Sequence, residues 1–87
     1  MDRAICPLYI ALMEWHDDID ARGLLCPLPV LKLRKRLAAR AGGEVVRITT
    51  TDPAAVVDIP HFCVEGGHRL VSSSEAEDAI TWLVAKG

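Results

Sequence analysis

The stretch that decides the fold is residues 26–51, CPLPVLKLRKRLAARAGGEVVRITTT. Four of its apolar side chains recur at helical spacing and share one face: Val30, Leu33, Leu37 and Ala41. This spacing predicts a helix from Pro27 to Ala41 that faces a core, and Gly42-Gly43 supplies the left-handed stop that commonly ends a helix. The β-branched run Glu44–Thr51 is typical of a strand. The stretch therefore predicts a helix followed by a strand.

The chain after residue 51 predicts a second helix. Asp52 followed by Pro53 is typical of a helix start, with Asp52 as the N-cap and Pro53 at the first helical position, where its missing N–H costs nothing. We expect this helix to be kinked or interrupted at Pro60, because a proline removes a hydrogen bond from the helix interior. Gly66-Gly67 is the expected end of the helix.

Three further segments predict strands. Residues 68–74 alternate weakly between polar and apolar side chains. Residues 79–86 are short and rich in Ile, Thr, Trp and Val, which favours a strand that closes a sheet. Upstream of the first helix, residues 17–21 predict a strand through a single strong strand former, Ile19.

Length and composition limit what the protein can be. A chain of 87 residues allows one small domain with a thin core, so chemistry is expected at a surface edge. Its near-apolar run, residues 4–13, is about half of what a membrane helix needs, so we expect no membrane role. Three widely spaced cysteines make a poor disulfide framework and favour a reducing, cytoplasmic setting.

Positive charge is concentrated on the first predicted helix. The net charge is −2, which argues against a general nucleic-acid binder, but residues 32–40 carry +5, so the rest of the chain carries −7. Lys32, Lys35 and Arg36 lie opposite the apolar face and would steer the protein toward acidic partner surfaces, unless they form only a solvated face. Arg34 falls within the apolar arc, so it must extend to the edge of that arc or contact a partner.

The first sixteen residues differ from the rest of the chain because they show no cap, turn signal or clear period. We interpret residues 1–16 as an N-terminal extension or a misassigned start, with translation beginning at Met13 as one hypothesis. A short helix that packs on the domain is the alternative. Cys6-Pro7 lacks a second proline and a helical pattern behind it, so we expect no role for Cys6.

The thiol of Cys26 is the strongest chemical candidate. A residue before proline is pushed toward extended geometry, so we expect Cys26 at the N-cap with Pro27 entering the helix. The helix N-terminus and the basic side chains would then stabilise the thiolate and make it nucleophilic near neutral pH. Gly23 permits the tight turn that leads into this corner, and Pro29 lies in the first helical turn. The alternative is an inert, small apolar residue.

Several motifs in order resemble one family. Residues 20–31, DARGLLCPLPVL, resemble the signature of the TusA (SirA-like) sulfur carriers, which share a Cys-Pro-x-Pro motif after a short strand. Three later motifs also resemble the family pattern: Asp52-Pro53, Asp58-Ile59-Pro60 with Phe62-Cys63, and Gly67-His68. The resemblance covers residues 17–87, which we expect to form a TusA-like sulfur-carrier domain.

This resemblance implies both a fold and a function. The fold would be an α/β (α+β) two-layer sandwich of order β-α-β-α-β-β, with two helices on one face of a four-stranded mixed sheet. Cys26 would be the persulfide carrier, supported by Gly23, Pro27 and Pro29 of its motif. It would accept sulfane sulfur from a cysteine desulfurase or rhodanese and pass it to an acceptor protein for tRNA thiolation, cofactor synthesis or sulfur oxidation. Such a protein is a sulfurtransferase-type covalent carrier rather than a stand-alone enzyme, and it needs no cofactor.

Other functions fit the residues less well. A regulatory or RNA-binding module would use the basic helix, but the run lacks interleaved aromatic residues, so we expect no stable nucleic-acid binding. A thiol redox enzyme would need a Cys-x-x-Cys pair. His61, Cys63 and His68 do not match the spacing of a zinc module, so we expect no metal site. We place Cys63 in the core, with a resolving thiol as the alternative.

Overall fold

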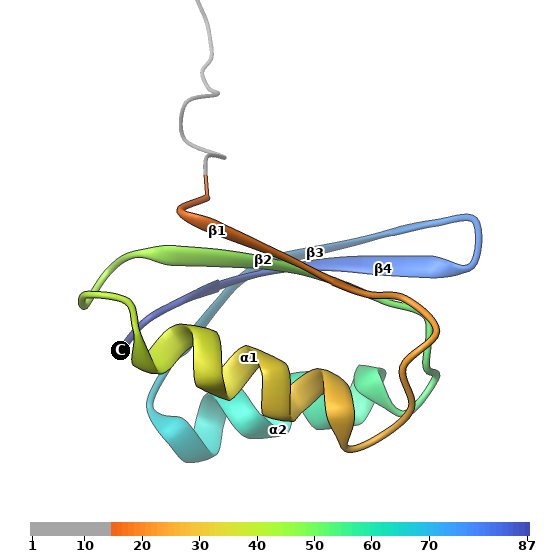
Figure 1. The fold of residues 1–87 in the computed structure, drawn as a ribbon, viewed down its shortest axis with the longest axis horizontal. Coiled ribbons are helices and arrows are strands. Elements are labelled where there is room, and N and C mark those ends of the chain that lie inside the picture. Colours follow the sequence, from red (N-terminus) through yellow and green to blue (C-terminus); the bar gives the residue numbers. More distant parts are fainter. Residues whose placement is uncertain (1–14) are drawn as a thin grey trace, which may run out of the picture.

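Six elements follow one another in the computed structural model, which describes residues 15–87. They are β1 (Asp17–Ala21), α1 (Leu28–Ala38), β2 (Val45–Thr50), α2 (Ala55–Gly66), β3 (Arg69–Ala76) and β4 (Ala79–Ala85). Figure 1 shows two layers, with the sheet above and both helices below it. The predicted β-α-β-α-β-β order and two-layer α+β sandwich are confirmed.

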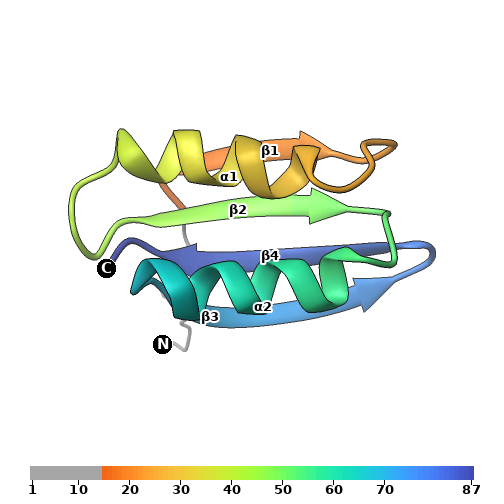
Figure 2. The same cartoon turned by 90° about the horizontal axis from the view of Figure 1, so that it is seen from below.

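The sheet is mixed and has the strand order β1-β2-β4-β3. β1 pairs with β2 in parallel, because α1 carries the chain back between them, whereas β4 is antiparallel to both β2 and β3. Seen from the helix side, α1 lies against β1 and β2, and α2 lies beside β3 and β4 (Figure 2). β4 therefore occupies the interior of the sheet and joins β2 to β3.

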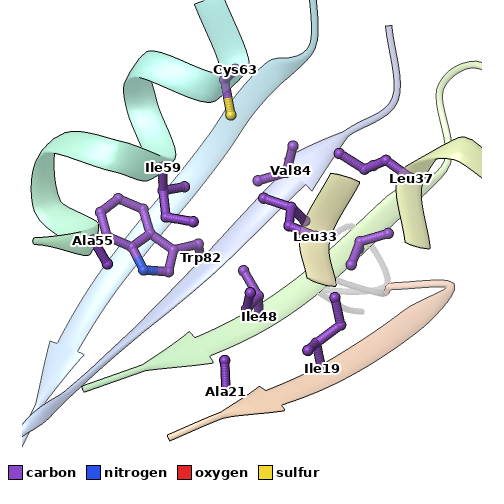
Figure 3. Packing of buried hydrophobic residues seen from close by; sticks show 11 residues of the cluster. Ile19, Ala21, Leu33, Leu37, Ile48, Ala55, Ile59, Cys63, Trp82 and Val84 are labelled. Atoms are coloured by element: carbon purple, nitrogen blue, oxygen red, sulfur yellow. The ribbon is translucent and has the colours of Figure 1, made fainter. Parts of the chain in front are cut away.

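The hydrophobic core fills the space between the sheet and the helices (Figure 3). It contains fully buried aliphatic side chains from both layers: Ile19, Leu33, Leu37, Ile48, Ile59 and Val84. Burying a side chain of this size contributes about 1.5–3 kcal/mol. The indole N–H of Trp82 donates a 3.0 Å hydrogen bond to Oγ1 of Thr50, so the polar atoms of these two buried side chains are paired.

α1 is shorter at both ends than the predicted Pro27–Ala41. It begins at Leu28 because the carbonyl of Pro27 accepts the first helical hydrogen bond, from the N–H of Leu31, which makes Pro27 the N-cap. It ends at Ala38 because the next two N–H groups, those of Ala39 and Arg40, donate to carbonyls three residues earlier instead of four. Nζ of Lys86 then donates to the carbonyl oxygens of Leu37, at 2.9 Å, and Arg40, at 3.3 Å.

α2 begins at Ala55, so the prediction of Asp52 as the N-cap is wrong. Residues 53–54 form a turn, Ala54 is the N-cap, and the Asp52 carboxylate accepts from the N–H of Ala54 at 3.1 Å. Of the kink or interruption expected at Pro60, the interruption is wrong, because α2 is continuous through this residue. Pro60 removes the partner of a single carbonyl, that of Val56, on an exposed part of the helix.

The first and third strands lie where the sequence predicts them, with small differences at the ends of the third. The strand predicted from Ile19 exists, and β3 runs two residues beyond the predicted end at Ser74. The N–H of His16 donates to the carbonyl of Val45 at 2.7 Å. The predictions about Cys6 and a start at Met13 lie outside the described residues, and the domain boundary at residue 17 stays a prediction. Within residues 15–87, no helix is both long and apolar enough to span a membrane.

Candidate functional site

Cys26 lies in the loop that joins β1 to α1. Arg22-Gly23 forms the turn that leaves β1, and Gly23 has φ +82°, a left-handed conformation that glycine adopts without strain. The N–H of Gly23 donates to Oγ1 of Thr51 at 2.9 Å, which ties the loop to the end of β2. Cys26 directly precedes the N-cap Pro27, and the peptide bond between them is cis. The predicted N-cap position of Cys26 is therefore wrong by one residue.

Asp52 holds the backbone of Cys26 in place. Its Oδ2 accepts a 2.7 Å hydrogen bond from the N–H of Cys26, while its Oδ1 accepts from the N–H of Ala54. One carboxylate thus connects the start of α1 to the start of α2, although Cys26 and Asp52 are 26 residues apart in sequence. The residue that the sequence marks as a helix cap acts instead as a clamp between the two helices.

The side chain of Cys26 is exposed and opens onto a groove of about 430 Å³ between α1 and α2. On the α1 side the groove is lined by Val30 and Arg34, and on the α2 side by Asp58, His61 and Phe62. Pro29 is buried in the first turn of α1, where a missing N–H costs nothing. The thiol is thus presented at an edge with charged, aromatic and aliphatic neighbours.

Carboxylates dominate the electrostatics of the thiol. A hydrogen bond to Asp58, removal from water and the negative charges of Asp58 and Asp52 raise the pKa of Cys26. The expectation of a stabilised thiolate is therefore wrong, because the carboxylates of Asp58 and Asp52 and removal from water move the pKa of Cys26 upward. The free thiol is the favoured form near neutral pH.

The structure separates the predicted basic residues. Arg34 lines the groove with Cys26. Lys32, Lys35 and Arg36 are exposed on α1 and do not line the groove. Nη1 of Arg36 pairs with Oδ1 of Asp17 at 2.7 Å, so part of this charge is already matched within the protein.

Of the other sulfur and imidazole groups, His61 lines the groove with Cys26, whereas Cys63 and His68 do not. Cys63 points into the core and is 3 % exposed, which confirms its predicted core position. Nδ1 of His68 accepts from the N–H of Gly87 at 3.0 Å, and Nε2 of His61 lies 3.8 Å from Glu65. Among the residues that the structure describes, no cluster of three or more His, Cys, Asp or Glu could hold a metal ion.

Sequence reasoning gave no chemistry to Asp58, the residue that most affects the thiol. It is half-buried on α2 and 32 positions from Cys26 in the printed sequence, so only the fold brings the two together. The available signal was the motif Asp58-Ile59-Pro60, which marked a family resemblance without assigning a role to the carboxylate.

Comparison with known proteins supplies the family. The sequence pattern of the family described as "Sulfurtransferase TusA" matches residues 17–86. The chain belongs to the TusA family. A relative from Allochromatium vinosum, described as a sulfur carrier protein TusA, is 35 % identical over 75 residues, which cover 86 % of this chain and 99 % of the relative.

A solved structure supports the TusA fold. The SirA-like protein from Desulfitobacterium hafniense superposes with a TM-score of 0.73 at 25 % identity, over 82 % of this chain and 97 % of that protein. The TusA pattern spans all six elements of the sandwich and both walls of the groove. The predicted family and fold of this TusA protein are therefore confirmed.

Proposed function

We propose that this TusA family member is a sulfur-relay carrier that holds sulfane sulfur as a persulfide on Sγ of Cys26. The observation that carries the proposal is the exposed thiol of Cys26 at the edge of the groove. Cys63 is buried in the core and cannot meet a partner without local unfolding. Family membership and the Cys-Pro-x-Pro motif support sulfur as the cargo.

The transfer is a thiol exchange at sulfur. The thiolate of Cys26 attacks the terminal sulfur of a persulfide on the donor protein, and a new S–S bond forms as the donor's S–S bond breaks. The electron pair of the broken bond leaves with the donor sulfur, which takes up the proton that Cys26 released. The sulfane sulfur keeps its oxidation state, so the step needs no oxidant. The same exchange, with Cys26 as the donor, loads the acceptor.

The surroundings of Cys26 suit contact with protein partners. Leu25, Leu28 and Leu31 are 67, 49 and 42 % exposed, and they lie near Cys26 in the sequence, in the loop and the first turns of α1. Apolar side chains of this kind gain free energy when a partner covers them. Lys32 and Lys35 would steer acidic partner surfaces toward this end, with an association rate that falls with salt.

The partners that we propose are a persulfide donor, of the cysteine desulfurase or rhodanese type, and an acceptor protein. The acceptor would use the sulfur in tRNA thiolation, cofactor synthesis or sulfur oxidation. A carrier that works through a free thiol needs a reducing compartment, which favours the cytoplasm. In this scheme the protein is a covalent carrier rather than a stand-alone enzyme, and it needs no cofactor of its own.

The test is sulfur loading followed by mass spectrometry. The full chain is incubated with a cysteine desulfurase and cysteine, and peptide mapping without reductant should place one added sulfur atom on Cys26. Cys26→Ser should abolish loading, whereas the matched control Cys63→Ser should load like the wild type. Loading that survives Cys26→Ser at another residue would contradict the proposal.

A further inference from the structure

Asp58 is placed to control the reactivity of Cys26. Its carboxylate is half-buried on α2 and lines the same groove as the Cys26 thiol, whose pKa it raises. The exchange chemistry of a carrier needs a thiolate, and a carboxylate next to a thiol opposes its formation. The fold therefore places an opposing charge beside the one group that it presents for reaction.

The other charged groups around Cys26 do not cancel this effect. From the loop before α2, Asp52 adds a second negative charge and is engaged with backbone N–H groups. From α1, Arg34 lines the groove, and from α2, His61 and Glu65 line it and lie 3.8 Å from each other. Asp58, removal from water and Asp52 raise the pKa of Cys26.

We propose that Asp58 is a specificity-determining residue, which restrains Cys26 against small electrophiles and oxidants and spares its reaction with protein partners. The inference rests on the proposed function. A partner that covers the groove can place a cationic side chain beside Asp58 and neutralise its carboxylate, and the low local dielectric of a closed interface strengthens that pairing. A small electrophile brings no such charge, so it meets the restrained thiol.

The restraint by Asp58 slows inactivation of Cys26 by small electrophiles and leaves the chemistry of sulfur transfer unchanged. With iodoacetamide, a small electrophile, Sγ forms a bond to carbon as the carbon–iodine bond breaks, and iodide leaves with the electron pair. The thiol proton goes to solvent. In sulfur transfer the same sulfur atom attacks a sulfur atom, and the proton ends on the donor thiol. Both reactions depend on the thiolate, but only the second occurs inside a protein interface.

The experiment compares the full-length wild type with Asp58→Asn and with Asp78→Asn. Asp78 lies exposed in the turn between β3 and β4, and its charge is not among those that raise the pKa of Cys26, so it controls for loss of a carboxylate elsewhere. Iodoacetamide reaction at Cys26 is followed by peptide mapping from pH 6.5 to about pH 10, which spans the ordinary thiol pKa. Persulfide loading from a cysteine desulfurase is measured on the same proteins.

Asp58→Asn should move the iodoacetamide pH profile of Cys26 to lower pH. For every tenfold gain in the thiolate fraction at neutral pH, the alkylation rate should rise only about threefold, because a less basic thiolate is also a weaker nucleophile. Loading by the desulfurase should rise less than alkylation or fall, and Asp78→Asn should match the wild type in both reactions. An unchanged profile would overturn the inference, and so would a rise in loading that equals the rise in alkylation.

A second measurement keeps the inference testable if Asp58→Asn does not fold. In the wild type, raising the salt concentration should move the Cys26 profile to lower pH, because salt screens a carboxylate that solvent reaches. A profile that does not move with salt would count against the restraint. If wild-type Cys26 takes no sulfur from the desulfurase, the proposed function fails, whereas the alkylation profiles still decide whether Asp58 restrains the thiol.

Discussion

Cys26 and Cys63 both have raised pKa values, but for different physical reasons. Cys26 is exposed at the edge of the groove, and the main cause is the hydrogen bond and charge of Asp58. Cys63 is 3 % exposed in the core, and the cause is burial alone. Cys26 is held protonated by Asp58, which another molecule can reach, whereas Cys63 is held protonated by the apolar core around it.

This difference determines what each thiol can do. A charge effect is reversible, because a partner can pair with the carboxylate and release the thiol. Burial is reversed only by opening the core, which costs free energy. Both Asp58 and Cys63 lie on α2. One face of this helix therefore supplies the carboxylate beside Cys26, and the other face buries Cys63 in the core.

The largest expected difference between the two thiols is their accessibility to iodoacetamide. In the folded protein at pH 8.5, Cys26 should react at least about a hundredfold faster than Cys63, since opening the core around a buried residue costs several kcal/mol. In 6 M urea the two rates should become similar. Quantitative peptide mapping checks this. Similar rates in the folded state would show that Cys63 is not held in the core.

A carboxylate placed in the core at Cys63 should destabilise the protein more than a carboxylate placed at its exposed neighbour Val64. Cys63→Asp should lower the free energy of unfolding by about 3 kcal/mol or more, because it buries a carboxylate without a partner. The neighbouring Val64→Asp is the matched control, and since Val64 is 82 % exposed, it should change stability by about 0.5 kcal/mol or less. Urea denaturation measures both. Equal losses would contradict the assigned burial.

A smaller effect is expected from removing the Asp52 carboxylate, which should loosen the backbone at Cys26 and leave the core around Cys63 unchanged. Asp52→Ala removes the acceptor of the Cys26 N–H, at a cost of about 1 kcal/mol. Amide hydrogen exchange at Cys26 should accelerate, while the alkylation rate of Cys63 should stay as in the wild type. Thr51→Ala, which removes a neighbouring acceptor from Gly23 instead, is the control. Unchanged exchange at Cys26 would show that Asp52 is not its clamp.

The smallest effect should be a loss of stability at alkaline pH. Burial raises the pKa of Cys63, so in this range the folded state holds more protons than the unfolded state. Its contribution is fully present below the unfolded pKa and is lost as pH rises through the folded pKa. Cys63→Ala should therefore show a shallower decline in unfolding free energy between pH 8 and about pH 10.5. An identical slope in both proteins would contradict this.

The local elements could be predicted from sequence because short-range patterns encode them. The spacing of Leu33 and Leu37 fixed the buried face of α1, and the β-branched run at residues 45–50 fixed β2. The exact helix ends could not be predicted, because distant groups decide them. Lys86 reaches the carbonyls at the end of α1, and Asp52 turns its carboxylate toward Cys26.

Only the local part of the candidate site could be predicted from the sequence. The Cys-Pro-x-Pro motif identified Cys26, since a proline on each side of the intervening residue marks an unusual helix start. The direction in which the pKa of Cys26 moves could not be predicted, because the local sequence contains basic residues whereas the acid that matters lies on another helix. Asp58 and Cys26 meet only after α1 and α2 pack side by side.

The position of β4 has a consequence for biosynthesis. β4 lies between β2 and β3, yet it is translated after both of them. Until residues 79–85 have been synthesised, β1-β2 and β3 have no shared partner, and a two-stranded unit is marginal on its own. The groove walls are held in place by this sheet, so a nascent chain that stops short of β4 contains Cys26 but cannot present it. Of the four strands in this sheet, β4 is synthesised last, and it is the strand that completes the support of the groove beside Cys26.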